Sequence, residues 1–251
     1  MNTVAIVLAA GQGKRMEGKV AKQYLLLKDR PVLYYTLKAF EDSLIDSVIL
    51  VTQEGEEDYC RKEIIEAYGL KKIAAIVSGG RERYHSVFQG LEAVSKHIPE
   101  CKYVFIHDGA RPFITNEIIV RTYEEVKRSK ACVAGMPVKD TIKIADADGY
   151  AKTTPERRLV WTVQTPQAFY FPFIKEAYEQ LMKNEDGLKE KGITITDDAM
   201  VVETFTRERV KLVEGSYENI KITTPEDLKI AEAFLTEKAD ERKEIAKKKE
   251  N

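Results

Sequence analysis

The chain has 251 residues, 43% of them hydrophobic, which is long enough for one domain with a substantial buried core. Its 40 Lys and Arg residues nearly balance its 41 Asp and Glu residues, giving a formal net charge of −1. No global field therefore favours nucleic acid or an anionic membrane as a partner, and any anion site has to be local. We expect a single domain over residues 1–251.

The amino-terminal sequence and the cysteines both favour a soluble, cytoplasmic protein. An apolar strand pattern begins at Val4 without the regions of a signal peptide, and no apolar stretch approaches the length of a membrane span. The cysteines, Cys60, Cys101 and Cys132, are odd in number and widely spaced. This spacing fits reduced packing residues better than a disulfide framework or a zinc site.

Apolar runs rich in β-branched residues alternate along the chain with segments of helical periodicity. The predicted strands lie at residues 4–8, 48–52, 73–77, 103–106 and 131–136. The predicted helices between them lie at residues 31–40, 56–68, 86–97 and 116–127. This alternation predicts an α/β fold, a Rossmann-like three-layer sandwich with a mostly parallel central sheet. A ligand is then expected beyond the carboxyl ends of the strands.

Two segments depart from this alternation. Residues 138–162 contain an alternating stretch and a turn at Asp148-Gly149, which predicts a β-hairpin arm that protrudes from the sandwich. A hairpin this small does not bury its own faces, so we expect a second copy of the chain to support it in a homodimer. Residues 225–251 predict a charged helix, and its short basic end fits a solvated helix terminus better than a nucleic-acid contact.

The first predicted strand leads directly into a loop suited to phosphate. The loop contains the small residues Ala9, Ala10, Gly11 and Gly13 and the cations Lys14, Arg15 and Lys22. Small residues let backbone N–H groups approach an anion, and the cations neutralise its charge. Arg15 stands where a P-loop needs Ser or Thr, and Met16 where a dinucleotide fingerprint needs its third glycine. The alternative is an ordinary glycine turn after a strand.

Two further polar loops are expected at the same edge of the sheet. Gly80 precedes a helix that contains Ser86, and together they offer backbone and hydroxyl donors, with a simple helix cap as the alternative. Asp108 ends a buried strand opposite the cationic loop and is suited to hold Mg²⁺ with phosphates and water. Its alternative is an internal ion pair with Arg111. For His107 we predict packing or hydrogen bonding and assign no chemical role.

The polar motifs further along the chain complete an ordered series that resembles a known family. They are Val138-Lys139-Asp140-Thr141, Arg157 before Trp161, Gln164-Thr165-Pro166-Gln167, Thr196-Asp197-Asp198-Ala199 and Asn219-Ile220-Lys221-Ile222-Thr223. With Asp108-Gly109-Ala110-Arg111-Pro112 and the first loop, this series resembles the 2-C-methyl-D-erythritol 4-phosphate cytidylyltransferases of the non-mevalonate isoprenoid route. The resemblance covers nearly the whole chain, from Val4 to Leu228. It implies that CTP and methylerythritol phosphate react to release pyrophosphate, with Mg²⁺ or another divalent cation required.

The resemblance also implies roles for matching residues. Arg15 and Lys22 would stabilise the pentacoordinate α-phosphate, and Arg157 and Lys221 would position the acceptor phosphate. Cations around both anions lower the repulsion between them as they approach in line. The nucleotide-binding positions would be Ala9, Ala10, Gly11, Gly13, Lys14, Gly80, Ser86 and Asp108, and Asp108 would also bind the metal. The acceptor-binding positions would be Asp108, Arg111, Thr141, Arg157 and Lys221. In the family the arm is exchanged between subunits, so Thr141 and Arg157 would complete the neighbour's site.

Two other functions remain open at this point. Ribitol 5-phosphate cytidylyltransferases share the sheet and several loops, but they tend to carry a bulkier residue where this chain has Gly109-Ala110. A regulatory nucleotide-binding protein without catalysis is the second alternative. Such a protein would have no need of Arg157 and Lys221 around an acceptor phosphate.

Overall fold

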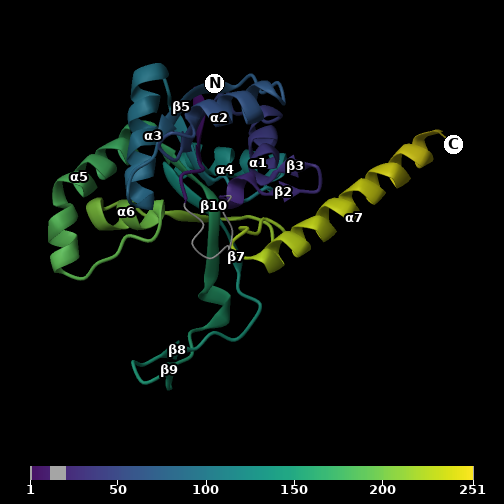
Figure 1. Cartoon of the computed structure of the whole chain (residues 1–251). Coiled ribbons are helices and arrows are strands. Elements are labelled where there is room, and N and C mark those ends of the chain that lie inside the picture. Colours follow the sequence, from purple (N-terminus) through teal and green to yellow (C-terminus); the bar gives the residue numbers. More distant parts are fainter. Residues whose placement is uncertain (1, 12–20, 251) are drawn as a thin grey trace.

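A seven-stranded sheet forms the centre of the protein (Figure 1). The computed structural model describes residues 2–11 and 21–250. The order of the strands across the sheet is β11-β7-β10-β6-β1-β4-β5. Their bounds are β1 (Thr3–Leu8), β4 (Ser47–Thr52), β5 (Ile73–Ser78), β6 (Tyr103–Asp108), β7 (Ala131–Pro137), β10 (Trp161–Tyr170) and β11 (Lys211–Glu214). Within the described residues β10 runs antiparallel to β6 and β7, and the other pairings of this sheet are parallel. The predicted mostly parallel sheet is confirmed.

Helices connect the strands and follow the last of them. They are α1 (Val32–Glu41), α2 (Glu57–Tyr59), α3 (Arg83–His97), α4 (Asn116–Ser129), α5 (Phe171–Glu190), α6 (Asp198–Phe205) and α7 (Pro225–Glu250). A short 3₁₀ helix, η1 (Lys22–Tyr24), precedes α1, and another, η3 (Arg157–Leu159), precedes β10. The helix predicted at residues 56–68 is a turn of α2 followed by a π-helical segment, η2 (Cys60–Glu66). Strand β10 and helices α5 and α6 lie where we predict no regular element.

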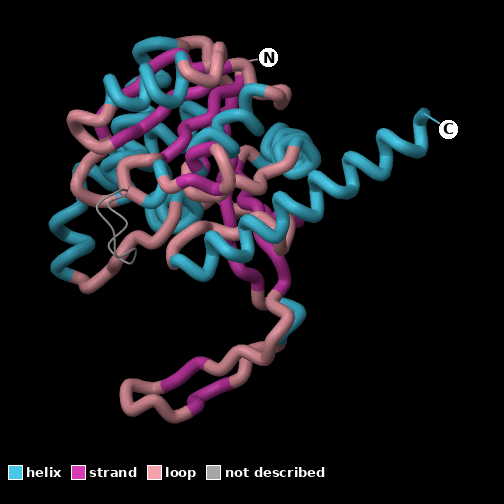
Figure 2. Tube along the Cα trace, turned by 45° about the vertical axis from the view of Figure 1, so that its right-hand side comes forward, coloured by secondary structure: helices cyan, strands magenta, loops and turns pink. Residues whose placement is uncertain are grey.

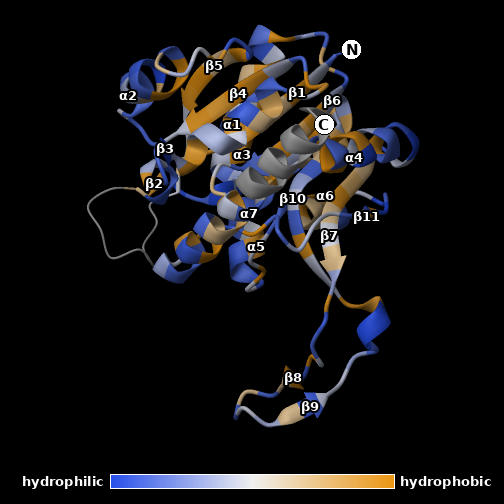
Figure 3. Cartoon of the chain, turned by 90° about the vertical axis from the view of Figure 1, so that its right-hand side faces the viewer, coloured by the Kyte–Doolittle hydropathy of each residue, from blue (hydrophilic) through white to orange (hydrophobic). Residues whose placement is uncertain are grey.

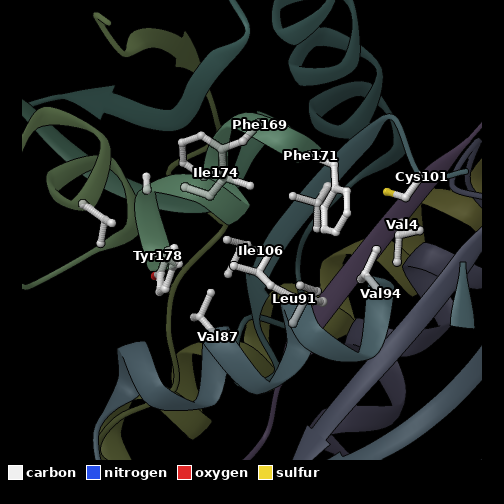
Figure 4. Close-up of a cluster of buried hydrophobic side chains, with 14 of the residues drawn as sticks. Val4, Val87, Leu91, Val94, Cys101, Ile106, Phe169, Phe171, Ile174 and Tyr178 are labelled. Atoms are coloured by element: carbon white, nitrogen blue, oxygen red, sulfur yellow. The ribbon is translucent and has the colours of Figure 1, made fainter. Parts of the chain in front are cut away.

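Two hydrophobic clusters cover opposite faces of the sheet, as its strands dictate. Successive side chains of a strand point to opposite faces, so Val4 and Ile6 of β1 belong to one cluster and Ala5 and Val7 to the other. Figure 4 shows the first cluster, in which α3 contributes Val87, Leu91 and Val94 and α5 contributes Ile174 and Tyr178. The second cluster includes Leu37 and Phe40 of α1 and Ile119 of α4. Figure 3 shows hydrophobic residues gathered on strands β1, β4 and β5. The fold is therefore the predicted three-layer sandwich.

The predicted arm protrudes from the end of β7 (Figures 1 and 2). Its strands, β8 (Ile144–Ala145) and β9 (Ala151–Thr153), pair antiparallel around a turn in which Gly149 has a φ of 86°. That backbone conformation favours glycine. Ile144 is 50% exposed and Tyr150 is 75% exposed, so the part of the chain that the structure describes leaves these side chains of the arm uncovered.

Helix α7 is anchored at its start and then extends away from the sheet (Figures 1 and 2). Its residue Ala231 is buried with Leu27 of β2 (Leu26–Leu27), with Val32 of α1 and with Ile222. Strand β2 pairs with β3 (Arg30–Pro31) in a separate small sheet. Among the described residues, no helix has both the length and the apolar character that crossing a membrane requires.

Candidate active site

A cavity of about 510 Å³ opens where β1 and β6 end and α3 begins. The residues in its wall that the sequence predicts as site residues are Ala9, Ala10, Gly11, Lys22, Gly80, Ser86, Asp108 and Lys221. The other lining residues are Leu8, Gln23, Arg81, Glu82, Arg83 and Ala110. A volume of this size accommodates a nucleotide-sized ligand, and the carboxyl ends of parallel strands are where α/β sheets bind ligands.

The first loop is held in place from both sides. The backbone N–H of Ala9 donates to the carbonyl of Val51, at a distance of 2.7 Å, and so joins the loop to β4. The buried Gln23 side chain donates from Nε2 to the carbonyl of Ala9 at 2.6 Å. Because Lys22 immediately precedes Gln23 in η1, this bond holds Lys22 beside the loop. The predicted residues Gly13, Lys14 and Arg15 lie outside the described residues.

The second loop packs directly on the first at a position that needs glycine. A Cβ atom on Gly79 would lie 2.5 Å from the Cβ of Ala10 and 2.6 Å from Ser86 Oγ, so a side chain there would force the two loops apart. The N–H of Gly80 donates to Ser86 Oγ at 3.1 Å. The close approach places Gly80 and Ser86 in the same cavity wall as Ala10.

Helix α3 has its own capping residues, so Ser86 is not its cap. The N-cap is Glu82, whose side chain accepts from the backbone N–H of His85. The His85 ring accepts in return from the Glu82 N–H, through Nδ1 at 3.2 Å. Ser86 is instead available to the Gly80 loop and the cavity, and the helix cap that the sequence allows in this segment is provided by Glu82.

Asp108 is a buried carboxylate surrounded by three cations. Its Oδ2 lies 2.9 Å from Lys221 Nζ and 3.5 Å from Arg111 Nε, and its Oδ1 lies 3.8 Å from Arg83 Nε. Burial by itself raises the pKa of Asp108, but Lys221, Arg83 and Arg111 outweigh it and hold the pKa well below its usual range. The carboxylate is therefore ionised. The ion pair with Arg111, which is the alternative interpretation of Asp108, is present in the structure, and Asp108 also lines the cavity.

Arg83 is not among the site residues predicted from the sequence. Its Nη1 and Nη2 donate to the two oxygens of the fully buried Asp198 at 2.9 and 2.7 Å. The hydroxyl of Tyr178 donates to the same carboxylate. Burial alone lowers the pKa of Arg83, but Asp198 more than reverses this effect, so the guanidinium stays charged. The Thr196-Asp197-Asp198 motif was the available signal, but its partner lies 115 residues away in sequence.

His107 is a hydrogen-bonded residue of the interior. Its Nε2 lies 3.3 Å from the carbonyl of Arg111, which only accepts, so Nε2 carries the proton. Nδ1 then accepts from the hydroxyl of Thr165 at 3.0 Å, and the oxygen of Thr165 accepts from the N–H of Asp108 at 3.1 Å. Burial lowers the pKa of His107 to about 4, so the ring is neutral near pH 7. This network fixes the backbone from which the Asp108 side chain extends.

The motif around Lys221 is tied to the end of β6. The carbonyl of Asn219 accepts from Arg111 Nη1 at 2.7 Å, and the N–H of Ile222 donates to the carbonyl of Ala110 at 2.8 Å. These two bonds flank Lys221 on either side. They explain how a residue far along the chain reaches Asp108.

Thr141 and Arg157 are not brought to the cavity of their own chain. Both side chains are exposed in the segment between β7 and β10, and neither lines the cavity within the described structure. Arg157 donates from Nη1 to the carbonyl of Lys139 at 3.2 Å. Within the described structure of one chain, these two predicted site residues therefore lie apart from the others.

Comparisons with known proteins identify the relatives of this chain. The family model described as 2-C-methyl-D-erythritol 4-phosphate cytidylyltransferase matches residues 3–237. A protein of that name from Lachnoclostridium phytofermentans is 51% identical over 236 residues, covering 94% of this chain and 97% of the relative. Another of that name, from Alkaliphilus oremlandii, is 46% identical and covers 96% of this chain and 98% of the relative.

The fold also matches solved structures. The crystal structure of 4-diphosphocytidyl-2C-methyl-D-erythritol synthase from Anaerococcus prevotii has a TM-score of 0.79 and 35% identity, over 93% of this chain and 96% of that one. The 2-C-methyl-D-erythritol 4-phosphate cytidylyltransferase from Thermus thermophilus has a TM-score of 0.70 and 31% identity, over 93% and 98% of the two chains. Together with the cavity and its motifs, these matches show that the chain belongs to the 2-C-methyl-D-erythritol 4-phosphate cytidylyltransferase family.

Proposed function

We propose that this chain transfers the cytidylyl group of CTP to the phosphate of 2-C-methyl-D-erythritol 4-phosphate and releases pyrophosphate. The observation that carries the proposal is the cavity in which Lys22, Asp108 and Lys221 meet two glycine-containing loops. This arrangement occurs in a chain whose relatives carry the name of that activity over nearly its full length.

The reaction asks the protein for alignment and positive charge. A phosphate oxygen of the acceptor attacks the α-phosphorus of CTP, and the bond from that phosphorus to the bridging oxygen of pyrophosphate breaks. Lys22 stabilises the charge of the pentacoordinate α-phosphate, while Lys221 positions the acceptor phosphate. Backbone groups of Ala10 and Gly80 hold the nucleotide. Arg15 assists Lys22 in this proposal, on the strength of the family resemblance.

Asp108 is the residue suited to hold Mg²⁺. Its ionised carboxylate lines the cavity. Among the described residues no group of three or more His, Cys, Asp or Glu side chains is placed to hold a metal ion by itself. Mg²⁺ is typically bound by one or two carboxylates together with substrate phosphates, so this donor set fits the ion. The ion would neutralise part of the charge of the triphosphate.

The complete enzyme in this proposal is a homodimer of one-domain chains. The arm of each chain supplies Thr141 and Arg157 to the cavity of its partner. Support comes from the exposed apolar side chains Ile144, Tyr150 and Leu159, which this chain leaves uncovered. Apolar surface of this kind is characteristic of an interface.

Pyrophosphate release tests the proposed function. The protein is incubated with CTP, Mg²⁺ and either methylerythritol phosphate or ribitol 5-phosphate. We expect release with methylerythritol phosphate and background release with ribitol 5-phosphate. Release with the ribitol compound alone would assign the other acceptor, and CTP binding without release from either mixture would indicate a regulatory protein.

A further inference from the structure

We propose that Arg83 is a positioning residue, which fixes the orientation of the Asp108 carboxylate so that the cavity binds Mg²⁺ together with CTP. This inference rests on the proposed function, because it needs Asp108 to hold the metal. Arg83 acts through Asp108, and the buried Asp198 holds Arg83 in place.

The guanidinium of Arg83 serves two carboxylates at once. Nη1 and Nη2 form a bidentate pair with Asp198, at 2.9 and 2.7 Å. The remaining nitrogen, Nε, faces Asp108 Oδ1 at 3.8 Å. A planar guanidinium carries donors along more than one edge, which a lysine ammonium does not. Simultaneous contact with Asp198 and Asp108 therefore requires an arginine at this position.

The anchor of Arg83 is rigid. Asp198 is fully buried as the first residue of α6, and Tyr178 of α5 donates to it. Asp197 caps the helix by accepting from the N–H of Met200 at 2.9 Å. With Asp197 in the helix cap and its own carboxylate bonded by Tyr178, Asp198 gives the guanidinium a fixed plane.

The three cations around Asp108 are divided between its two oxygens. Lys221 and Arg111 lie on Oδ2, at 2.9 and 3.5 Å, whereas Arg83 lies on Oδ1. Among the ion pairs of the described residues, Arg83 thus provides the contact to Oδ1. Positive charge beside both oxygens restrains rotation of the carboxylate about its Cβ–Cγ bond. The cavity then presents the same oxygens to an incoming cation, which is how neighbouring groups tune metal binding elsewhere.

A purely structural role for Arg83 has to be separated from this one. Removing Arg83 alone leaves the buried charge of Asp198 without its cation, which is strongly destabilising. Replacing both members of a buried pair together leaves no buried charge unpaired, and where the new side chains pack well the change in stability is often small. The double variant Arg83→Gln with Asp198→Asn therefore keeps the fold and removes the contact to Asp108.

The measurement is CTP binding by isothermal titration calorimetry, with Mg²⁺ and with EDTA, on proteins whose thermal unfolding is recorded in parallel. The Mg²⁺-dependent gain in CTP affinity is the readout. In the double variant we expect this gain to fall by about 10-fold to 100-fold, the usual effect of losing a group that orients a metal ligand. A double variant with wild-type stability and an undiminished gain would overturn the proposal.

Two further variants make the result unambiguous. Arg83→Lys keeps a cation for Asp198 but has one nitrogen, so it is expected to fold and to lose the gain, and a wild-type gain in this variant would also overturn the proposal. Lys175→Gln is the control. It breaks an ion pair with Glu179 at 2.9 Å and a contact to Glu92 that links α5 to α3 outside the cavity wall. This variant should leave the Mg²⁺-dependent gain in CTP affinity unchanged. A wild-type protein without any gain would refute the metal-dependent function itself.

Discussion

At the scale of a single residue, substitution of Lys22 tests the proposed stabilisation of the α-phosphate. It lies in the cavity wall, and the bond from Gln23 to the Ala9 carbonyl holds its segment in position before any ligand binds. Loss of a preorganised charge that acts on a transition state costs on the order of 10² to 10³ in rate, so we expect Lys22→Ala to lower kcat by that factor. The check is steady-state pyrophosphate release at saturating CTP and acceptor.

The matched control for Lys22 is Lys38→Ala. Lys38 is a partly exposed lysine of α1 that pairs with Asp42 one turn later, and it is not among the residues that line the cavity in the described structure. Its kcat should equal that of the wild type. An unchanged kcat in Lys22→Ala would remove this lysine from the catalytic assignment.

Single residues differ in how far the sequence determines their place. Asp108 could be predicted at the cavity because it ends a buried strand, and strand ends meet at one edge of the sheet. Arg83 could not, because the sequence does not distinguish it from Arg81 two positions earlier. What distinguishes it is Asp198, which the fold brings to one guanidinium and not the other.

At the scale of elements, Glu185 ties the end of α5 to the first turn of α3. Its Oε1 accepts from the Tyr84 hydroxyl at 3.0 Å and its Oε2 lies 3.1 Å from His85 Nε2. Hydrogen bonds from Lys189, His85 and Tyr84 lower the pKa of Glu185 to about 2. A carboxyl whose pKa is depressed on folding adds stability above its unfolded value, near 4.5, and this contribution is lost as the pH falls toward 2.

The lowered pKa of Glu185 determines how the stability of a Glu185 variant should depend on pH. Because Glu185 is partly exposed, we expect Glu185→Gln to cost about 1 kcal/mol of unfolding free energy at pH 7. The difference from the wild type should shrink as the pH falls from 4.5 toward 2. Urea unfolding of both proteins at a series of pH values measures it, and a difference that stays constant down to the acid limit would contradict this account.

The start of α7 depends on one carboxylate. Asp227 Oδ2 accepts from the N–H of Thr223 at 2.7 Å and from the N–H of Thr224 at 2.9 Å. Loss of such a helix-start contact costs about 1 kcal/mol, so Asp227→Ala should lower the unfolding free energy by that amount in urea titrations. Glu226→Ala, at the neighbouring position, is the control and should change it by less than about 0.5 kcal/mol.

Elements buried on both faces could be predicted, and those with polar interiors could not. Strands β1 and β4 are continuous apolar runs because helices cover both sides of the sheet. Strand β10 carries Gln164, Thr165 and Gln167 in its interior, and its ladder with β7 shifts register between Val163 and Gln167, around Pro166. Its polar side chains form hydrogen bonds with partners distant in sequence, such as Gln167 with Asp197 at 2.9 Å. The local sequence pattern therefore does not indicate a central strand.

At the scale of the whole molecule, the arm provides the test of the homodimer. If Arg157 serves the partner's cavity, a mixed dimer of Lys22→Ala and Arg157→Ala chains contains one cavity with both residues intact. Random exchange makes half of the dimers mixed, so about a quarter of the wild-type activity should appear after mixing two nearly inactive proteins. The measurement is pyrophosphate release before and after subunit exchange. Differently tagged chains show that the exchange has taken place. No recovery after proven exchange would show that each site is built within one chain.

The hairpin of the arm could be predicted from one chain, but the surface that its tip contacts could not. Its alternation and its Asp148-Gly149 turn indicated the hairpin, and the structure has a short ladder there with an exposed tip. In the proposed homodimer the surface that covers this tip belongs to the partner. One chain shows the exposed apolar residues, such as Ile144 and Tyr150, without the surface that they contact.

The placement of β10 between β6 and β7 means that the strands of the sheet do not become available in their spatial order during synthesis. Both sheet partners of β7 are strands made after it, β10 and β11, so β7 leaves the ribosome before anything it pairs with. Strands β1, β4, β5 and β6 are already complete by then and pair with one another. The cavity gains its last wall residue when Lys221 has been added. A growing chain thus acquires most of its parallel sheet early and its capacity for CTP near the end of translation.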